Sequence, residues 1–234
     1  MPVPFSQKSA QLDHIKKCVA RKAWELFIQP DRNPRILIDA GSSAKAVADV
    51  IHAKLRELGD EAVVPTVFTH NLAAWEVLAQ SEPKVDLYLI GGRYTPDLNA
   101  VIEQDVYEGQ LEKWTPNISI IAVSGIDSKG VYCSNIQDEA LVKGTLTKKE
   151  VEKRIIVCDH SKIAQTDVKK FSSLEDLKEL CKEVYLVTDR YDWKQVQPEY
   201  LQDDYKKTLE RLEDLNCNVI EVDIGPEGDS TIAS

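Results

Sequence analysis

The sequence has no run of basic residues from which a nucleic-acid-binding surface could be built. Its 234 residues include 39 acidic and 29 basic side chains, which give a formal net charge of −10. The densest basic stretch, KKEVEKR at 148–154, itself contains two glutamates. Because binding to DNA or RNA needs a basic patch that displaces counterions from phosphates, this charge distribution argues against direct nucleic-acid contact.

Paired cysteines, an amino-terminal leader and long apolar runs are also lacking. The five cysteines are odd in number and widely spaced, and no C-x-x-C pair occurs, which argues against a disulfide framework and against a zinc site. The amino terminus, MPVPFSQKSAQ, has no apolar core of the signal-peptide type, and no apolar stretch approaches the length of a membrane span. We therefore expect a cytoplasmic protein without membrane contact, and predict neither a metal nor a cofactor.

Short apolar runs alternate with segments of helical periodicity along most of the chain. Runs such as RILIDA, VDLYLIGG and ISIIAVSG have the length of single strands. Strands that are apolar throughout and joined by helices indicate a parallel sheet covered on both faces. The predicted fold class is therefore α/β, with a mostly parallel sheet and helices on both faces. Helices are expected over residues 6–28, 44–58, 72–79, 136–149, 173–181 and 198–215.

Glycine is scarce, and its placement is informative. Of ten glycines, Gly41, Gly91, Gly92 and Gly125 each follow a predicted strand. In a parallel sheet, ligands bind beyond the carboxyl ends of the strands, where glycine lets the backbone approach closely or adopt positive φ. These four loops could therefore converge on a ligand, although a strand-to-helix turn often needs glycine for its own geometry.

The loop DAGSSAKA, which begins at Asp39, leads from an apolar run into a helix. It offers Gly41, the hydroxyls of Ser42 and Ser43, and the unpaired amides of a helix N-terminus, which together suit a phosphate or a carboxylate. The loop is not a P-loop or a dinucleotide fingerprint, since both need further glycines. The alternative is that one of the serines only caps the helix.

The next predicted strand, TVFT, ends in Thr69 and is followed by two further polar residues. Thr69, His70 and Asn71 stand together there. Asn71 either caps the following helix or points into the same cleft. His70 is a possible acid–base group, although a lone histidine in a loop is more often solvated.

The segment VCDHSK places four polar residues at the end of another predicted strand. Lys162 could supply a point charge for a phosphate, and Asp159 could orient it or act as a base. Any exposed loop can have the same composition, so the pattern alone leaves both interpretations open. TDR at 188–190 is a weaker version of the same pattern.

The stretch SGIDSKGVYCSNIQDEALVKG at 124–144 collects acids and a lysine around a helix start. Ser134 with Gln137 fits a capping box, and Glu139 with Lys143 is a favourable pair four residues apart. Charge pattern alone therefore favours a structural role for this stretch. Asp127 lies in the turn that precedes the helix.

Taken in order, these motifs resemble the effector-sensing domain of the DeoR family of bacterial transcriptional regulators. The resemblance covers residues 8–190. The matching segments are IDAGSSAKAVADVI for the family's D-x-G-[ST]-T loop, FTHN for its T-N, LIGGRY for its G-G strand end, SGIDSKGVYCSNIQDEALVKGTL for its G-[IV]-x-x-x-x-G…E…K segment, VCDHSKIAQ for its D-x-[ST]-K loop and LVTD for its I-T-D.

The resemblance implies a Rossmann-like α/β fold, of the kind found in ribose-5-phosphate isomerase, with a phosphorylated sugar or related metabolite as ligand. By analogy, residues 39–43 would take the phosphate with Lys162 near it, and Asp127, Glu139 and Lys143 would line the sugar end. Further ligand contacts are implied at strand ends: Thr69, Asn71, Gly91, Gly92, Gly125 and Asp159. We expect a single sensor domain over 1–234, with a helical segment at 1–30, a core at 31–224 and a flexible tail at 225–234.

Two departures from the family pattern bear on function. The family's regulators carry a winged helix-turn-helix before this domain, whereas here only the helix expected over 6–28 precedes the first strand. We therefore expect no DNA-binding module, which agrees with the acidic charge. The phosphate loop also reads GSSAK where a second threonine is usual.

Three hypotheses follow from these observations. The first is a metabolite sensor or regulatory subunit that binds a sugar phosphate, as a homo-oligomer or with a partner regulator protein. The second is an aldose–ketose phosphate isomerase, with Asp127 or Glu139 as base and Lys143 stabilising the enediolate. The third is a purely structural or oligomerising partner.

Overall fold

A seven-stranded parallel sheet forms the centre of the molecule. The structure is a computed structural model that describes residues 7, 12–134, 136–166, 169–196 and 199–224. The strand order is β12-β11-β9-β6-β1-β2-β3, and every neighbouring pair is parallel. The strands are β1 (Arg35–Ile38), β2 (Thr66–Thr69), β3 (Asp86–Leu89), β6 (Ile118–Ala122), β9 (Val151–Val157), β11 (Cys181–Asp189) and β12 (Asn218–Val222).

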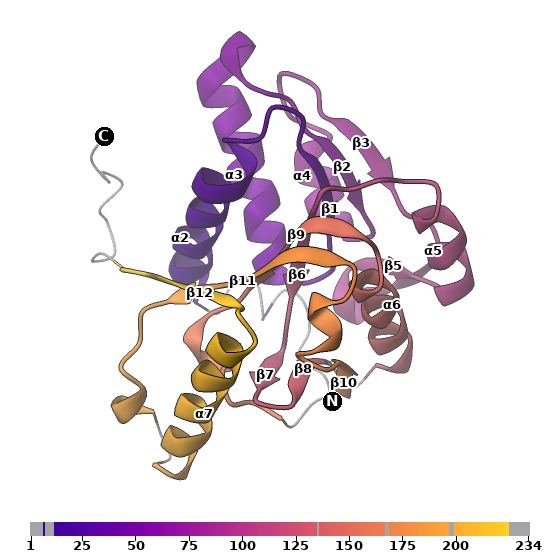
Figure 1. Ribbon diagram of the computed structural model, residues 1–234. Helices are drawn as coiled ribbons and strands as arrows, with labels where there is room; N and C mark the ends of the chain where they lie inside the picture. The colour runs from indigo at the N-terminus through magenta and orange to yellow at the C-terminus, as the bar shows by residue number, and fades with distance from the viewer. Residues whose placement is uncertain (1–6, 8–11, 135, 167–168, 197–198, 225–234) are drawn as a thin grey trace.

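Helices cover both faces of this sheet (Figure 1). On one face lie α2 (Asp13–Ala23), α3 (Ser42–Leu58) and α4 (Leu72–Leu78), and on the other lie α5 (Gln104–Leu111), α6 (Gln137–Thr147) and α7 (Tyr200–Asp214). The strands supply both cores in alternation: Ile36 and Ile38 belong to the core under α2 and α3, and Leu37 belongs to the core under α5 to α7. A strand buried on both faces explains why these runs are apolar throughout. The predicted fold class, Rossmann-like α/β, is confirmed.

The remaining elements are short. A three-stranded antiparallel sheet comprises β7 (Gly125–Asp127), β8 (Gly130–Cys133) and β10 (Lys169–Ser172), and a two-stranded hairpin comprises β4 (Arg93–Thr95) and β5 (Ala100–Ile102). The described residues also form one π-helical turn, η1 (Trp24–Ile28), and five 3₁₀ turns: η2 (Gly59–Glu61), η3 (Pro96–Leu98), η4 (His160–Lys162), η5 (Asp176–Lys178) and η6 (Trp193–Gln195).

Most predicted helices are confirmed, and one is wrong. The helices expected over 44–58, 72–79, 136–149 and 198–215 correspond to α3, α4, α6 and α7, although 197–198 lie outside the described residues. The expected helix over 173–181 is only the single turn η5, and β11 already begins at Cys181 because Cys181 pairs with Val151 of β9. The first helix is described from Asp13 and ends in the π-helical turn η1.

The segment between β3 and β6 contains one further helix, α5. The chain first makes the β4–β5 hairpin and only then α5, which ends three residues before Trp114. The Trp114 ring stacks on Phe68 of β2 with centroids 4.8 Å apart, and this contact holds the end of the segment against the sheet. The predicted tail, 225–234, lies outside the described residues.

The order of the strands marks one edge of the sheet as the place for a site. From β1 the chain adds β2 and β3 on one side, and then adds β6, β9, β11 and β12 on the other. The carboxyl ends of β1 and β6 therefore meet at a topological switch point, where the following loops diverge to opposite faces and leave room for a ligand.

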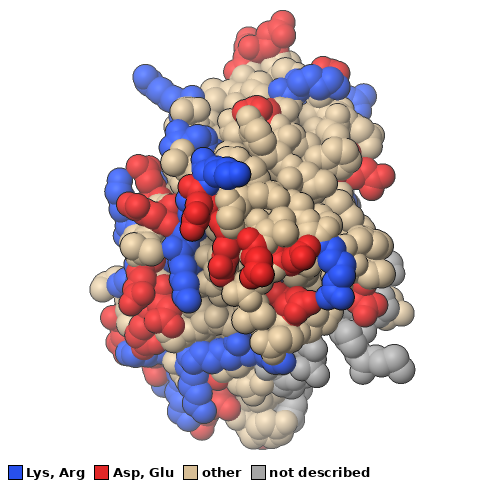
Figure 2. Space-filling view, turned by 90° about the vertical axis from the view of Figure 1, so that its right-hand side faces the viewer, with Lys and Arg blue, Asp and Glu red and all other residues tan. Residues whose placement is uncertain are grey.

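The surface agrees with the charge of the sequence. On the face that Figure 2 shows, acidic and basic side chains lie interspersed, and the described residues drawn there form no extended basic patch. No helix within the described ranges has the length and apolar character that a membrane span needs.

Candidate functional site

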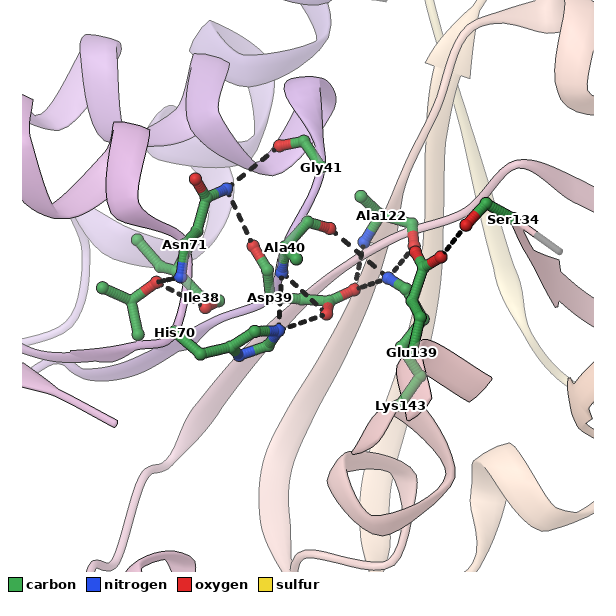
Figure 3. A network of polar contacts seen from close by, with 11 residues as sticks. Ile38, Asp39, Ala40, Gly41, His70, Asn71, Ala122, Ser134, Glu139 and Lys143 are labelled. Atoms are coloured by element: carbon green, nitrogen blue, oxygen red, sulfur yellow. Dashed lines mark hydrogen bonds and ion pairs between the residues drawn. The ribbon is translucent and has the colours of Figure 1, made fainter. Parts of the chain in front are cut away.

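Asp39 lies at the switch point, immediately after β1, and is completely buried. Its Oδ1 accepts a hydrogen bond from the Ala40 amide at 2.8 Å, and its Oδ2 accepts one from the Ala122 amide at 3.1 Å, at the end of β6. Lys143 of α6 also donates to Oδ2. This carboxylate therefore joins the ends of two neighbouring strands and a helix from the far face of the sheet (Figure 3).

Lys143 is a buried cation whose hydrogen-bonding capacity is fully used. Besides Asp39, its Nζ donates to the carbonyl oxygens of Ala122 at 2.8 Å and Ala40 at 3.4 Å. An ammonium group has three protons, and three acceptors surround this one. Burial, the largest single cause, lowers the pKa of Lys143, but the charges of Asp39 and Glu139 and the hydrogen bond to Asp39 together raise it by more, so the net shift is upward. The lysine thus stays charged and neutralises Asp39.

His70 closes the other side of the Asp39 carboxylate. Its Nε2 accepts from the Ala40 amide at 3.2 Å and lies 3.5 Å from Asp39 Oδ1. Burial lowers the pKa of His70 to about 3, and the positive charge of Lys143 contributes to the same shift. His70 is therefore neutral with its proton on Nδ1, an atom that has no hydrogen-bond partner among the described residues. The expectation of a solvated loop histidine is wrong, because only 1% of this residue is exposed.

Thr69 and Asn71 brace the loop that follows β1. The Thr69 hydroxyl donates to the Ile38 carbonyl at 2.8 Å and accepts from the Asn71 amide at 3.1 Å. The Asn71 side chain donates to the carbonyl oxygens of Asp39 at 3.2 Å and Gly41 at 3.1 Å, while its Oδ1 caps α4 by accepting from the Ala74 amide at 3.2 Å. Asn71 therefore does both things that the sequence left as alternatives: it caps its helix and it faces the candidate site.

The N-terminus of α3 is open at this same point. The residue before the helix is Gly41, at a φ of 123°, and no side chain caps the first turn within the described part of the chain. A Cβ at Gly41 would stand 2.9 Å from that of Ala122, so a close approach of the two strand ends requires glycine here. Neither Ser42 nor Ser43 caps the helix, which removes the alternative explanation for this loop. Its first amides have no intrahelical acceptors.

The segment 124–144 separates into two structural units. Asp127 closes the β7–β8 turn, with Oδ1 accepting from the Lys129 amide at 2.9 Å, the Gly130 amide at 3.0 Å and the Tyr132 hydroxyl at 2.9 Å. Burial, with help from Asp127, raises the pKa of Tyr132 to about 12. Asp127 thus stabilises its own hairpin through Oδ1, and it makes no contact with the Asp39 network within the described part of the chain.

The start of α6 also differs from the expected capping box. The residue before the helix is Ile136, which makes no side-chain cap, and Ser134 donates its hydroxyl proton to Glu139 rather than pairing with Gln137. Glu139 is 5% exposed and its charge contributes to the upward pKa shift of Lys143. Lys143 pairs with Asp39, because leaving a completely buried carboxylate unpaired costs more free energy than a surface ion pair along the helix would gain.

The other predicted glycines serve local packing. The Gly91 amide donates to Gln110 Oε1 at 3.0 Å, and Gly92, at a φ of 143°, passes close to the backbone of Glu103. Gly125 is the first residue of β7 rather than part of a strand-to-helix loop, and a Cβ there would meet the Gln165 carbonyl oxygen at 2.4 Å. The described structure records no contact between these three glycines and the Asp39 network.

Asp159 and Lys162 stand two strands away from β1, at the turn η4 after β9. Asp159 caps this turn by accepting from the Ser161 amide at 3.1 Å and from the Ser161 hydroxyl. The Lys162 Nζ donates to the same hydroxyl at 3.2 Å at the surface. Between them, His160 contacts Asp189 at the end of β11, a pair for which the only sequence signal was a histidine beside one strand end and TD at the next.

The described residues contain no group of three or more His, Cys, Asp or Glu side chains that could hold a metal ion. The polar groups gathered at the switch point are instead a neutralised carboxylate, a neutral histidine and an open helix N-terminus. This combination suits an anionic organic ligand rather than a cation.

Residues 13–189 match the DeoR C-terminal sensor domain family, a match that includes every element of the site described above. The chain belongs to this family of sensor domains. A search of curated proteins gave no match.

Solved structures similar to this sensor domain include two isomerases at low identity. Ribose 5-phosphate isomerase A from Methanocaldococcus jannaschii is 13% identical with a TM-score of 0.44, over 64% of this chain and 54% of that one. Ribose 5-phosphate isomerase from Plasmodium falciparum is 18% identical with a TM-score of 0.42, over 65% of this chain and 53% of that one. The sensor domain therefore spans little more than half the length of these proteins.

Proposed function

We propose that this sensor domain binds a phosphorylated sugar at the switch point, with the phosphate on the first amides of α3. The observation behind the proposal is the uncapped N-terminus of this helix of 17 residues, placed beside the junction of β1 and β6. Unpaired amides and the positive end of the helix dipole both favour an anion there. The serine hydroxyls at 42 and 43 can add further hydrogen bonds.

The charges around the loop favour the same ligand. Asp39 precedes Gly41 by two residues and would repel a phosphate if it were unpaired, but Lys143 neutralises it within the protein interior. Lys162, in the turn after β9 and two strands from β1, supplies a surface cation for the bound anion. A charge-assisted bond from an ammonium group to phosphate is stronger than a neutral one.

Binding is better supported than catalysis by the residues suggested for an isomerase. Asp127 accepts three hydrogen bonds in its hairpin, Glu139 accepts the Ser134 hydroxyl, and Lys143 has no proton left for an enediolate oxygen. An isomerase would also need a cation for the enediolate oxygen, and freeing Lys143 for that role would require its bonds to Asp39 or to the carbonyl oxygens to break. We therefore propose a sensor that signals through a partner or a second copy, and not an isomerase.

Isothermal titration with inorganic phosphate and a panel of pentose and hexose phosphates tests this function. Ser42→Asp should abolish binding, because a carboxylate at the first helical position occupies the anion site while it stabilises the helix. Gln104→Asp is the matched control, since it places the same group at the first position of α5. Equal affinity in both variants, or no binding by the folded wild-type protein, would contradict the proposal.

A further inference from the structure

The turn η4, which carries Lys162, is held by buried carboxylates from two neighbouring strands. Asp159 at the end of β9 accepts from the Ser161 amide and hydroxyl. Asp189 at the end of β11 accepts from the His160 amide at 2.7 Å, and its other oxygen lies 2.5 Å from His160 Nδ1. The two carboxylates therefore hold adjacent residues of one turn.

A tyrosine completes this arrangement around the imidazole. The Tyr191 ring stacks on the His160 ring with centroids 4.0 Å apart and planes inclined by 1°. Asp189, the last residue of β11, fixes the ring through Nδ1, and Tyr191, two residues further on, covers one of its faces, so these two contacts determine the orientation of His160.

Burial gives these contacts their importance. Asp159 is 1% exposed and Asp189 is 2% exposed, and a buried carboxylate is costly without hydrogen-bond donors. The donors here come from the backbone and side chains of His160 and Ser161. Because both amides already point at carboxylates, the backbone of η4 has no free donors at these positions for an anion. The contribution of this turn to an anion site is therefore the side chain of Lys162.

The position of Lys162 depends on how the turn is held. β9 is separated from β1 by β6, so the lysine must reach across about 10 Å, two strand spacings, to meet an anion at the N-terminus of α3. The turn has only three residues, with backbone bonds from the Lys162 amide to the Asp159 carbonyl and from the Ile163 amide to the His160 carbonyl, both 3.1 Å long. A small rotation of so short a turn displaces a long side chain.

We propose that His160 is a positioning residue that acts through Lys162: clamped by Asp189 and Tyr191, it holds η4 so that the lysine ammonium meets the bound phosphate. The inference rests on the proposed function. It assigns a role to a histidine and an aspartate that the Asp39 network does not use. His160 is not a ligand contact in this proposal, and its removal matters only while Lys162 is present.

A double-mutant cycle on phosphate affinity tests the proposal. Isothermal titration with inorganic phosphate would compare the wild-type protein, His160→Gln, Lys162→Met and the double variant. We expect Lys162→Met to weaken binding about tenfold and His160→Gln about fivefold, with the double variant no weaker than Lys162→Met, because coupled residues are not additive. His52→Gln, which removes an imidazole bonded to Ser81 at 3.0 Å far along α3, should leave the affinity unchanged.

Each other outcome overturns the proposal in a distinguishable way. Additive losses would make His160 an independent ligand contact, and an unchanged affinity in His160→Gln would deny it any role. Absence of phosphate binding by the wild-type protein would instead overturn the proposed function itself. If His160→Gln does not fold, as judged by circular dichroism, Asp189→Asn takes its place in the cycle with the same expected non-additivity.

Discussion

Two buried carboxylates at the same edge of the sheet, Asp39 paired with Lys143 and Asp189 paired with His160, differ in what surrounds each pair. Asp39 and Lys143 are 0% and 3% exposed at the side chain, whereas His160, the partner of Asp189, is 22% exposed. In the inner pair, the cation comes from a helix on the far face and uses all its protons inside the protein. In the outer pair, the partner of Asp189 is an imidazole on a surface turn that also carries Lys162.

The difference shows that a charged pair near a candidate site is not by itself a ligand contact. Lys143 stands in the segment where the sequence gathers acids and a lysine around a helix start, yet its three acceptors inside the protein leave no proton to donate to a ligand. Lys162 has a single recorded acceptor, the Ser161 hydroxyl, and its Nζ lies at the surface. A lysine can bind a ligand only if its ammonium group still has a free proton and can be reached from solvent, and of these two lysines Lys162 meets both conditions. The Asp39–Lys143 pair instead holds the loop after β1, where the proposed phosphate site lies.

The largest expected effect comes from breaking the inner pair. Lys143→Met leaves the Asp39 charge buried without its partner, which should lower the free energy of unfolding by about 3–5 kcal/mol. Urea denaturation would measure the change. The double variant Asp39→Asn, Lys143→Met removes both charges and should recover part of the loss. A change below about 1 kcal/mol in the single variant, within the ordinary range for a surface substitution, would contradict the structural role.

A second prediction concerns the neutral histidine beside that pair. The pKa of His70 is about 3 in the folded protein, below the value of about 6.5 for an unfolded chain, so the unfolded state binds one more proton between these values. The stability contributed by this residue is therefore present above pH 6.5 and is lost as the pH falls toward 3. Between pH 7 and pH 5 the loss should be about 2 kcal/mol.

Urea denaturation of His70→Gln over the same pH range isolates the contribution of His70 to the pH dependence of the free energy of unfolding. The glutamine oxygen can accept from the Ala40 amide as Nε2 does, but it does not titrate. The wild-type protein should lose about 2 kcal/mol more than the variant between pH 7 and pH 5. Parallel curves for the two proteins would show that His70 is charged or exposed, against the burial described here.

Much of the fold could be predicted from sequence because a parallel sheet buried on both faces has a clear pattern. The helix expected over 173–181 failed for a tertiary reason. Leu174 and Leu177 have helical spacing and are buried, but Leu180 adopts a φ of 55° and Cys181 must already be extended to pair with β9. The short strands β7, β8 and β10 were missed because three or four residues carry too little periodicity to detect.

The residues of the site could be placed at one edge, but their pairing could not be predicted. Strand ends identify Asp39 and Asn71, and the helix after β8 identifies Lys143. The bond between Asp39 and Lys143 joins residues 104 positions apart, while the pattern of the sequence favours a local partner for the lysine. Whether such a group is buried and saturated depends on packing between elements, which local spacing does not report.

The smallest expected effect separates the hairpin acid from the site. Asp127→Asn keeps the shape of the side chain but removes the charge that accepts three hydrogen bonds, which should lower the free energy of unfolding by about 1–2 kcal/mol. Affinity for inorganic phosphate and for sugar phosphates should stay unchanged, because Asp127 is engaged within the β7–β8 turn. Titration and urea denaturation of the same sample measure both quantities. A tenfold loss of sugar-phosphate affinity, with inorganic phosphate unaffected, would place Asp127 at the sugar end after all and weaken the distinction between saturated and available groups.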